Sequence, residues 1–541
     1  MLCFRCVKAG LLFILVVSCF FVCSQNSLFA ATNNPFPDVI SKSPLAVGVE
    51  VFANIPDSAG SFARVNQMLA SPDGTLFVLD QRGSIYEVSA DGLSVNSYLF
   101  LGSNVSLATS NEQGLQSMAF HPDFYSSGEP GYGKLYTIHS SSDKSPTPDF
   151  RPGGGSNAHD TVLLEWTTDA PSAIPFEPEN PAAPFREVMR LEQPYSNHNA
   201  GLIAFNPNAQ VGEADYGKLY VAIGDGGSGG DPLGLSQDAS NPYGAILRID
   251  PLASGGSAYA IPGDNPFVGD SSMLDVIWAY GLRNPQRFHW DSQNRMLIAD
   301  IGQGVVEEIN LGVAGGNYGW NEREGSYEYI SSGSVSNSDT RSDASTTGYI
   351  YPVAEYDHGE GNAVTAGFVY EGQVDSHLAG KFLFGDIRRG RVFFFDATSL
   401  PDGGQDPIRE LRLLDNGTEK SFLSMIQETN PSTGRADLRF GQDSARNLYL
   451  LNKKDGKIRK IIPLPRTRIV GTELQGSLFS LKFSGEAGVS DWLLKGSNDL
   501  NGFPDDLTAG TTLTEPSPGN YEAAVDLSGF PDTYFIRIIR E

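Results

Sequence analysis

A histidine and an aspartate, placed at the ends of neighbouring apolar stretches, are the residues of this sequence best suited to chemistry. His198 stands in YSNHNAGLIAFNP, where Asn and Gly flank it just before a predicted strand. Asp225 ends the next strand, in AIGDGGSGGDP. A histidine general base requires a carboxylate that fixes the tautomer of its imidazole. The pair therefore indicates a proton-transfer site, whereas the ordinary alternative is a structural or exposed histidine.

An arginine and an asparagine follow in a turn bounded by Gly and Pro. Arg283 and Asn284 stand in AYGLRNPQRF, where Pro285 restricts the backbone before it and so aims the two side chains. A guanidinium is a planar fork of donors that suits carboxylates or quinone oxygens, although an arginine after a strand is commonly a surface residue. Further arginines would form a positive pocket if several faced the same mouth: Arg388, Arg389, Arg391, Arg435 and Arg439.

A third segment, DIGQGVVEEINLGVAGGNYGW, combines a carboxylate pair with tight turns. Calcium prefers hard oxygen ligands, which carboxylates and the carbonyls of tight turns supply. Glu308 and the carbonyls of Gly302, Gln303 and Tyr318 could form such a set, and the alternative is a solvated acidic turn. Likewise, the run GDGGSGGDP (224–232) either lets the backbone lie against a flat ligand or is a plain flexible loop.

One phrase, a turn followed by a short apolar strand, recurs six times. The copies are DGTLFVLD (73–80), GKLYTIH (133–139), GKLYVAIGD (217–225), NRMLIAD (294–300), GKFLFGD (380–386) and RNLYLLN (446–452). Because several copies continue into a polar turn and a second strand, the spacing predicts an all-β, six-bladed β-propeller with four strands in each blade. A β-sandwich array is the alternative. Two insertions rich in Ser, Pro, Gly and Asp, 140–184 and 325–351, are expected to be surface loops.

Residues 1–31 have the pattern of a secretory signal peptide. Arg5 and Lys8 precede the apolar run 11–22, and small residues up to Ala31 offer a cleavage site. The run is too short for a membrane span, so we expect a periplasmic or secreted protein without a transmembrane segment. A lipoprotein signal ending at Cys19 is the alternative. All four cysteines fall within this leader, which excludes disulfides and thiolate metal sites from the rest of the chain.

The charge balance limits the partners. A formal charge of −26 argues against nucleic acid, because phosphate binding needs a basic surface, and a well-solvated extracellular surface explains the acidity.

About 510 residues after the leader can bury a large core without disulfides. We assign the propeller to residues 45–464. Alternating strands in 467–541 predict a separate small β-sandwich, an accessory or attachment module.

Several of these motifs occur in an order that resembles the glucose/sorbosone dehydrogenase family, the soluble quinoprotein sugar dehydrogenases. The resemblance covers roughly Asn66–Ile462. It rests on EQGLQSMAFHPDF (112–124), HNAGLIAF (198–205), GDGGSGGDP, YGLRNPQRF (280–288), GQGVVEEIN with GGNYGW (302–320) and FGDIRRGRV (384–392).

The resemblance implies a six-bladed propeller that binds pyrroloquinoline quinone (PQQ) at its mouth over a calcium ion. His198 would remove the proton from the anomeric hydroxyl of a small-molecule sugar while hydride passes to the quinone, and Asp225 would orient His198. Arg283 would stabilise charge on the quinone oxygens, with help from Asn284. Because no cysteine is left for a haem motif, electrons would pass to a separate acceptor, a cytochrome or a quinone. Cofactor contacts would come from Glu112, Gln113, Asn284, Arg388 and Arg435.

The chain also departs from the family pattern. Arg388 stands where glucose-specific members have a lysine, and Arg435 is a single arginine where they have an Arg-x-Arg clamp for the PQQ carboxylates. Some relatives with this propeller bind protein partners. The alternative function is therefore a non-catalytic, calcium-stabilised propeller that serves as a binding or adhesion module. A metal-dependent lactonase on another six-bladed propeller is disfavoured, because the ordered motifs are those of the quinoprotein family.

Overall fold

The structure is a computed structural model that describes residues 31–464 except 111, 157–158, 254 and 373–376. Between 468 and 540 it describes the residues outside 476–477, 485–491, 498–504, 508–510, 518–519, 527 and 529–534. The predicted signal peptide, except Ala31, lies outside the described residues. None of the helices in the described part of the chain is long and apolar enough to cross a membrane.

Six blades of four antiparallel strands make up the propeller, and blades five and six belong to one continuous sheet. Blades one to three are β3 (Val65–Ala70), β4 (Leu76–Asp80), β5 (Ser84–Val88), β6 (Val95–Phe100); β7 (Leu115–Phe120), β8 (Lys134–Ser141), β9 (His159–Thr167), β10 (Phe185–Gln193); and β11 (Ala200–Phe205), β12 (Leu219–Ile223), β13 (Ala245–Ile249), β14 (Ile277–Ala279). Blades four and five are β15 (Pro285–Trp290), β16 (Met296–Asp300), β17 (Val306–Leu311), β21 (Ala354–Asp357); and β22 (Val364–Val369), β23 (Lys381–Asp386), β24 (Val392–Asp396), β25 (Arg409–Asp415). Blade six is β27 (Arg439–Gln442), β28 (Leu448–Leu451), β29 (Lys457–Ile462) and β2 (Lys42–Asn54).

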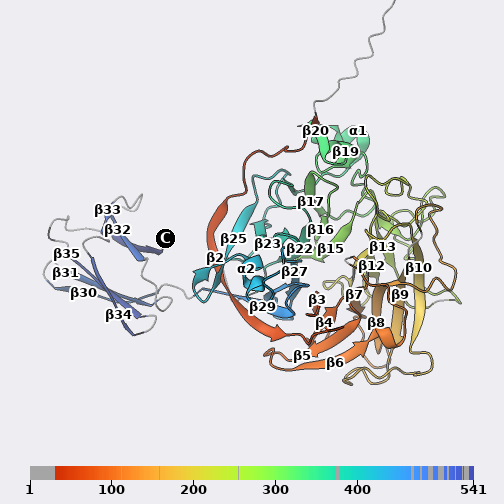
Figure 1. Cartoon of the computed structure of the whole chain (residues 1–541), viewed down its shortest axis with the longest axis horizontal. Helices are drawn as coiled ribbons and strands as arrows, with labels where there is room; N and C mark the ends of the chain where they lie inside the picture. The colour runs from red at the N-terminus through yellow and green to blue at the C-terminus, as the bar shows by residue number, and fades with distance from the viewer. Residues whose placement is uncertain are drawn as a thin grey trace, which may run out of the picture.

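The long strand β2 closes the ring. It pairs antiparallel with β29 as the outer strand of blade six, and it also pairs parallel with β25 of blade five. Figure 1 shows β2 running along the outside of these two blades, far in sequence from both. The first strands of the blades adjoin one another around the axis, in the order β3, β7, β11, β15, β22 and β27. Closure leaves no exposed sheet edge between the first and last blades.

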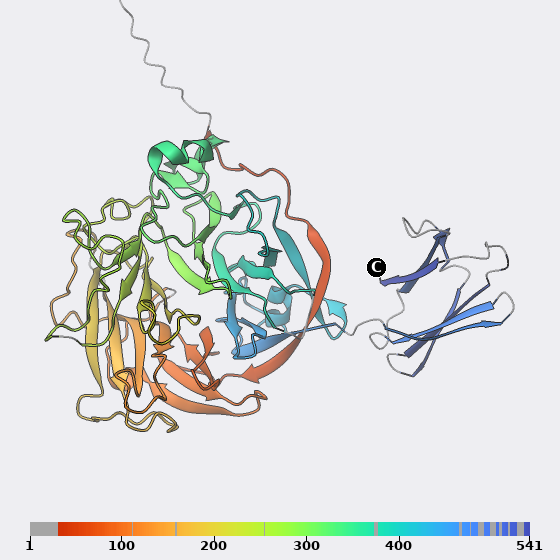
Figure 2. The ribbon, with the colours of Figure 1, turned by 180° about the vertical axis from the view of Figure 1, so that it is seen from behind.

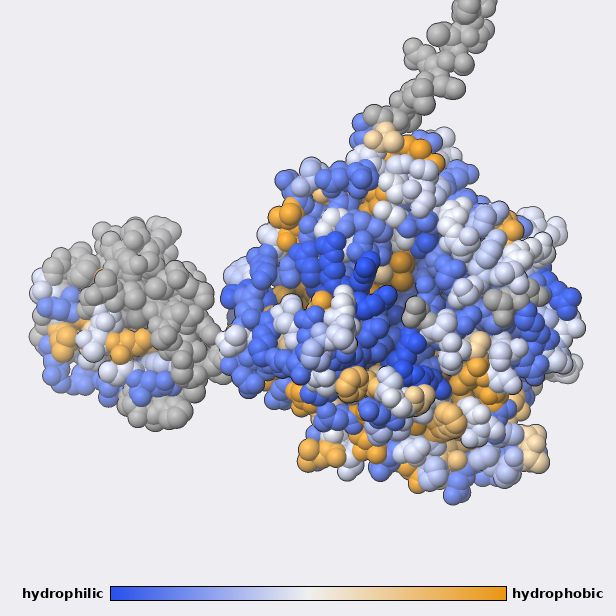
Figure 3. Space-filling view, viewed as in Figure 1, coloured by the Kyte–Doolittle hydropathy of each residue, from blue (hydrophilic) through white to orange (hydrophobic). Residues whose placement is uncertain are grey.

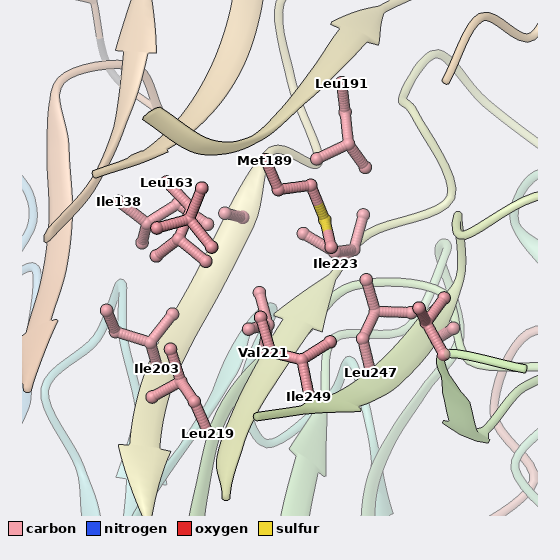
Figure 4. Packing of buried hydrophobic residues seen from close by; sticks show 14 of the residues in the cluster. Ile138, Leu163, Met189, Leu191, Ile203, Leu219, Val221, Ile223, Leu247 and Ile249 are labelled. Atoms are coloured by element: carbon pink, nitrogen blue, oxygen red, sulfur yellow. The ribbon is translucent and has the colours of Figure 1, made fainter. Parts of the chain in front are cut away.

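The six recurring phrases all form the second strand of a blade, so the sequence prediction of a six-bladed propeller is confirmed. These strands are buried on both faces, which explains their unbroken apolar sequences. In β12, Leu219, Val221 and Ile223 pack against blade two, whereas Tyr220 and Ala222 pack against blade four. Figure 4 shows the first of these contacts, between side chains of blades two and three.

The hydrophobic core is divided between the blades. Among the described residues, six buried clusters lie one at each interface between neighbouring blades, including the interface of blades six and one. Each blade therefore depends on two neighbours for burial of its apolar side chains. The ring is stable only as a whole, and it fixes where each loop at its mouths must lie.

The two insertions are not plain loops, and that expectation was wrong. The first contains β9, whose residues HDTVLLEWT are buried inside blade two between β8 and β10. The second contributes to a small sheet of β1 (Ala31–Thr32), β20 (Ser334–Asp339), β19 (Tyr327–Ser331) and β18 (Arg323–Glu324). Short strands flanked by polar turns were hidden by the Ser- and Gly-rich composition around them. The remaining short elements are η1 (Leu101–Ser103), η2 (Arg341–Asp343), α1 (Ala344–Thr347), β26 (Thr418–Glu419) and α2 (Phe422–Gln427).

The C-terminal strands form sheets of their own, as the sequence predicted for a small β-sandwich. One described sheet has the order β30 (Arg468–Gln475), β31 (Leu478–Ser484), β35 (Asn520–Asp526), β34 (Thr511–Ser517). The other has the order β33 (Asp505–Asp506), β32 (Trp492–Ser497), β36 (Phe535–Arg540). Figure 2 shows these strands apart from the ring of blades.

The propeller has two mouths of different character. The loops that follow the second strands open at one mouth, which we call the loop mouth. At the opposite mouth the hairpins between first and second strands surround a hollow of about 630 Å³, lined among others by Met68, Phe368 and Phe440. None of the residues predicted to form the site lines this hollow. On the face shown in Figure 3, hydrophilic side chains predominate and hydrophobic ones are scattered.

The turn before β8 provides a test of the fold. Gly133 has φ +67°, and a Cβ there would lie 1.9 Å from the carbonyl oxygen of Thr168. Gly128 has φ +91° and open space around it. We expect Gly133→Ala to lower the free energy of unfolding by about 3 kcal/mol and Gly128→Ala by about 1 kcal/mol, because only the first adds a clash to backbone strain. Chemical denaturation of both variants measures this difference, and equal losses would contradict the packing described here.

Candidate active site

Four aspartates lie where second strands reach the loop mouth: three are the last residues of β4, β16 and β23, and the fourth lies two residues beyond β12. We call Asp80, Asp225, Asp300 and Asp386 the strand-end carboxylates, and all four are buried. In blades one, four and five they accept backbone N–H groups from the loop that precedes the first strand of the same blade. Asp300, for example, accepts from Arg283 at 2.8 Å and from Asn284 at 2.6 Å. These carboxylates therefore fasten the loops of the mouth to the sheets.

In blade three the strand-end carboxylate contacts a histidine side chain instead of the backbone N–H groups of the preceding loop. Asp225 Oδ1 lies 2.6 Å from Nδ1 of His198, the residue two positions before β11. Both side chains are almost fully buried, with exposed fractions of 6% for His198 and 1% for Asp225. Nε2 of His198 has no hydrogen-bond partner among the described residues. The carboxylate therefore orients the ring, and Nε2 remains available to take a proton, while the role of the pair in proton transfer stays a prediction.

The rest of the Asp225 carboxylate is also held by donors. Oδ1 accepts the backbone N–H of Gly227 at 2.9 Å, and Oδ2 accepts Nε1–H of Trp320 at 3.0 Å. Burial by itself raises the pKa of Asp225. The neighbouring His198 and Arg283 outweigh this effect and hold that pKa below its usual range. Asp225 thus stays ionised at neutral pH, which suits a group that must orient a histidine and stabilise its charged form. Trp320 was not identified from the sequence as part of this site.

The His198 loop is anchored from blade two. His198 has φ +53°, and its backbone N–H donates to Oε2 of Glu112 at 2.9 Å. Asn199 donates to the carbonyl of Glu112 at 3.1 Å and contacts Nε2 of His159 at 2.5 Å. Gln113 Nε2 lies 3.0 Å from Nδ1 of the same histidine. Glu112 and Gln113, predicted as cofactor contacts, therefore lie beside His198 and help to position its loop.

Arg283 is held tightly rather than left free. Its Nη1 donates to the carbonyls of Ile301 at 2.8 Å and Gly302 at 2.7 Å. Nε and Nη2 both donate to Oε1 of Gln303, at 3.2 and 3.1 Å, and the guanidinium lies 5.6 Å from the ring of Trp320. These four bonds use four of its five N–H donors, which leaves one for a ligand. Asn284 lies directly beside it at the start of β15.

The glycine-rich run 224–232 is an ordered part of this mouth. The N–H of Gly230 donates to Oε1 of Gln303 at 2.9 Å, and the N–H of Ser228 donates to Oδ1 of Asn197 at 3.0 Å. At Gly227, φ is +101° and a Cβ would lie 2.5 Å from the carbonyl oxygen of Asn197. The backbone thus passes too close to the His198 loop for a side chain at this point, and the description as a plain flexible loop is wrong.

The carboxylate pair of blade four is buried inside the sheet, so the solvated acidic turn is wrong as well. Glu308 lies in β17 between Asp300 of β16 and Glu355 of β21. Burial raises the pKa of all three carboxyl groups, that of Asp300 to about 7. None of the three has an ion-pair partner in the described chain. Glu307 points elsewhere, because its carboxylate contacts Nε2 of His358 at 2.8 Å.

The four predicted calcium ligands divide into two groups. The carbonyl of Gly302 and the side chain of Gln303 hydrogen-bond to Arg283. Glu308 instead accepts from the N–H of Gly325 at 2.6 Å and from Asn310 at 3.1 Å, and the hydroxyl of Tyr318 donates to the carbonyl of Leu311 at 2.8 Å. No group of three or more His, Cys, Asp or Glu side chains in the described part of the chain is arranged to hold a metal. Calcium would therefore depend on backbone carbonyls as well as on Glu308.

The two predicted clamp arginines also lie at the loop mouth, on blades five and six. Arg388 follows β23 with an exposed side chain, and its carbonyl accepts the N–H of Ala436 at 2.9 Å. Arg435 turns to Asp437, with Nε 2.5 Å from Oδ1. Lys453 and Arg439, which the sequence did not single out as cofactor contacts, lie buried close by. The lysine pair in the turn NKKDG was the only signal available for Lys453.

With the fold and the site described, comparison with known proteins gives the family. The sequence model of glucose/sorbosone dehydrogenase matches residues 63–419. The chain belongs to the glucose/sorbosone dehydrogenase family. The resemblance inferred from its motifs is thereby confirmed, and so is the propeller fold that it implied.

Individual relatives are more distant. HIPL1 protein of Arabidopsis thaliana is 29% identical over 481 residues, covering 80% of this chain and 64% of the relative. Hedgehog-interacting protein of Homo sapiens is 25% identical over 408 residues, covering 73% and 50%. An aldose sugar dehydrogenase of Escherichia coli is 29% identical over 137 residues, covering 25% and 32%. The chain spans less than two thirds of the length of these relatives.

Solved structures support the fold. The PQQ-bound form of an aldose sugar dehydrogenase from Streptomyces coelicolor superposes with a TM-score of 0.51 at 20% identity, covering 77% of this chain and 99% of that one. The apo form of the soluble aldose sugar dehydrogenase from Escherichia coli gives a TM-score of 0.52 at 19% identity, covering 77% and 100%. At these identities the similarity shows the propeller architecture alone.

Asp225→Asn tests the carboxylate that orients His198. The amide cannot accept all three donors, so we expect it to lower the free energy of unfolding by about 1–3 kcal/mol at neutral pH. A carboxyl group with a lowered pKa stabilises the fold above its unfolded pKa of about 4 and loses that effect as pH falls through the folded value. The difference between wild type and variant should therefore shrink in acid.

Thermal unfolding between pH 3 and 8 measures this difference. Asp80→Asn is the matched control, because Asp80 ends the corresponding strand of blade one and accepts backbone N–H groups but no histidine. We expect Asp80→Asn to lower the free energy of unfolding by less than Asp225→Asn does. A difference for Asp225→Asn that did not vary with pH would contradict the proposed ionised state.

Proposed function

We propose that this chain catalyses the PQQ- and calcium-dependent oxidation of aldose sugars to lactones, with electrons passed to a separate acceptor. The observation that supports this most directly is the buried contact between His198 and Asp225, which leaves Nε2 of the histidine open at the loop mouth. Family membership supports the same reaction class, sugar oxidation. We further propose that the protein works outside the cytoplasm after export, as the leader pattern predicted.

The residues at the loop mouth fit an anionic, planar group such as PQQ. Nε of Arg439 is buried and has no hydrogen-bond partner in the part of the chain described, and Lys453 is buried beside it. Trp320 offers a ring that already stacks with the guanidinium of Arg283. PQQ, when bound, would supply the acceptor for the hydride from the anomeric carbon. All other parts of the reaction fall to the residues of the chain.

His198 would act as the general base. Its Nε2 would take the proton of the anomeric hydroxyl as the C–H bond breaks, so that the C–O bond becomes the carbonyl of the lactone. Asp225 would keep the proton on Nδ1 and stabilise the imidazolium that forms. Arg283, through its one remaining N–H and its charge, would stabilise negative charge that develops on the acceptor side. Its other donors would hold the loop of Gly302 and Gln303 in place.

One assay tests the reaction. Purified protein is mixed with PQQ, calcium, a panel of aldoses and an artificial dye acceptor, and bound PQQ is measured by its absorbance after desalting. We expect dye reduction that depends on all the components. If no dye is reduced and no PQQ is retained, the proposed function is wrong.

His198→Gln separates catalysis from binding. We expect it to lower kcat by at least about 100-fold with little change in retained PQQ, because a general base contributes about 10²–10⁴-fold to a rate. His121→Gln is the matched control, since His121 is also buried beside a carboxylate, that of Asp123 at 3.6 Å, but takes no part in the loop mouth. Loss of PQQ from His198→Gln would show that the histidine binds the cofactor rather than acting as the base.

We propose that calcium binds in blade four with Glu308 as its carboxylate ligand. Three neighbouring carboxyl groups, Asp300, Glu308 and Glu355, are buried without an ion-pair partner in the described chain, and Oε2 of Glu324 is buried there without a hydrogen-bond partner. Carboxylate oxygens suit calcium, but these side chains are not arranged as a metal site by themselves, so the ion would also need backbone carbonyls. The carbonyl of Gly302 already accepts a hydrogen bond from Arg283. The carbonyl oxygens of Gln303 and Tyr318 are therefore the backbone ligands that remain from the predicted set.

Glu308→Gln tests the calcium proposal. Calcium at about 100 times its Kd should stabilise the wild type by about 2.7 kcal/mol, and this response should be lost in the variant. Without calcium the variant should unfold at a higher temperature than the wild type, because it removes a buried ionisable group that has no ion-pair partner. Glu165→Gln is the control: Glu165 is equally buried but paired with Arg186 and Lys134, so its variant should be less stable and keep the calcium response. A wild type that calcium does not stabilise would exclude this site.

A binding module without redox activity is the second candidate function. Arg435 is engaged by Asp437 rather than open as a clamp, and one of the relatives is named for its interaction with Hedgehog. Retention of PQQ decides between the two candidates, because a binding module has no need of the cofactor.

A further inference from the structure

Three cationic side chains converge on the axis of the propeller. Two of them, Arg439 and Lys453, lie toward the loop mouth, whereas Arg287 lies deeper and also lines the hollow at the opposite mouth. They come from different elements: Arg287 from β15, Arg439 from β27 and Lys453 from the loop after β28. Their exposed fractions are 7%, 3% and 7%. Arg287 crosses the axis, because its Nη2 donates to the carbonyl of Asn66 in blade one at 3.0 Å. Charges buried at this depth ordinarily have a carboxylate partner.

Lys453 and Arg439 lack such a partner. Among the described residues no hydrogen bond or ion pair is formed by Nζ of Lys453. Nη1 of Arg439 donates to the carbonyl of Leu438 at 2.7 Å, but its Nε is buried without a hydrogen-bond partner. Burial lowers the pKa of Lys453 well below its usual range, and Arg439 lowers it further. Burial likewise lowers the pKa of Arg439 to about 10. Both groups are therefore costly in the ligand-free protein.

The carboxylates close to them are already committed. Asp437 accepts from Arg435 at 2.5 Å and from Lys454 at 2.9 Å. Glu112 raises the pKa of Arg439, but its Oε2 accepts the backbone N–H of His198. The axis therefore carries more positive than negative charge, although the chain as a whole carries −26. Glu112 also connects the two parts of the mouth, since it contacts the His198 loop and acts on Arg439.

We propose that Lys453 and Arg439 bind a carboxylate group of an anionic ligand at the propeller axis. They would do so on the same blade where Gly434 and Ala436 flank Arg435 and leave it a single arginine. The carboxylate belongs either to PQQ or to an acidic sugar such as a uronate, and the chemistry of recognition is the same. This site stands on direct binding and does not require that the chain be an oxidoreductase.

Lys453→Met tests the site, with Lys454→Met as a matched control. Lys454 is the neighbouring residue, but it is partly exposed and paired with Asp437. Binding is measured by titration calorimetry with PQQ, with glucuronate and with glucose, and stability by the Tm of the ligand-free protein. We expect Lys453→Met to raise the Tm and to weaken the binding of a carboxylate ligand at least tenfold. Lys454→Met should leave binding within twofold and should not raise the Tm.

The ligands distinguish the source of the carboxylate. Loss of PQQ binding with glucuronate unaffected assigns the site to the cofactor, and the reverse assigns it to an acidic substrate. Unchanged binding of both in Lys453→Met, or a wild type that binds neither, would overturn the proposal. If the Met variant does not fold, Lys453→Gln replaces it. Dye reduction is measured separately, so a protein that binds PQQ through Lys453 but reduces no dye would refute the proposed reaction and leave this site standing.

Discussion

The site depends on one recurring contact, that between a carboxylate at the end of a second strand and the loop before the first strand of the same blade. The strand ends are fixed by the interfaces between blades, which bury apolar side chains on both faces of each second strand. The carboxylate transfers that rigidity to the mouth, because a charged acceptor holds a backbone N–H strongly at a buried position. In blades one, four and five this contact only shapes the mouth. In blade three a carboxylate at the same position holds an imidazole, so the contact that elsewhere stabilises a loop here orients a side chain that could take a proton.

The distribution of buried charge gives the mouth its second property. Among the described residues, positive groups without an ion-pair partner gather at the axis, at Arg439 and Lys453, whereas carboxyl groups without one gather inside blade four, around Glu308. Burying either set unpaired costs free energy, and the two sets do not form ion pairs with each other in the described chain. An anion at the axis and a cation in blade four would relieve both. The two proposed ligands thus follow from separate electrostatic imbalances, and either can be tested without the other.

The fold and the core of the site could be predicted from the sequence because both are local patterns. The second strands are unbroken apolar runs that mostly end in aspartate, and His198 and Asp225 belong to consecutive elements of one blade. Aligning the ends of the six phrases would also have revealed the strand-end carboxylates as a set. The burial of Glu308 could not be predicted. Its strand, β17, pairs with a neighbour on each side, but the Gly-rich turns around it are typical of an exposed loop. Lys453 was missed because its burial requires several blades to meet at the axis, a contact that no local pattern in NKKDG records.

The His198 loop shows why this arrangement points to chemistry rather than to structure alone. In the other three blades that have a strand-end aspartate, its oxygens hold backbone N–H groups of the loop before the first strand, which stabilises the mouth directly. In blade three Asp225 holds a side chain instead of the backbone of the loop before the first strand. The His198 loop, with its positive φ, is therefore anchored by Glu112 from another blade. A propeller selected only to bind partners on its surface would gain stability from the simpler contact. The costlier arrangement is explained if the imidazole must be held in one tautomer, with Nε2 facing a ligand.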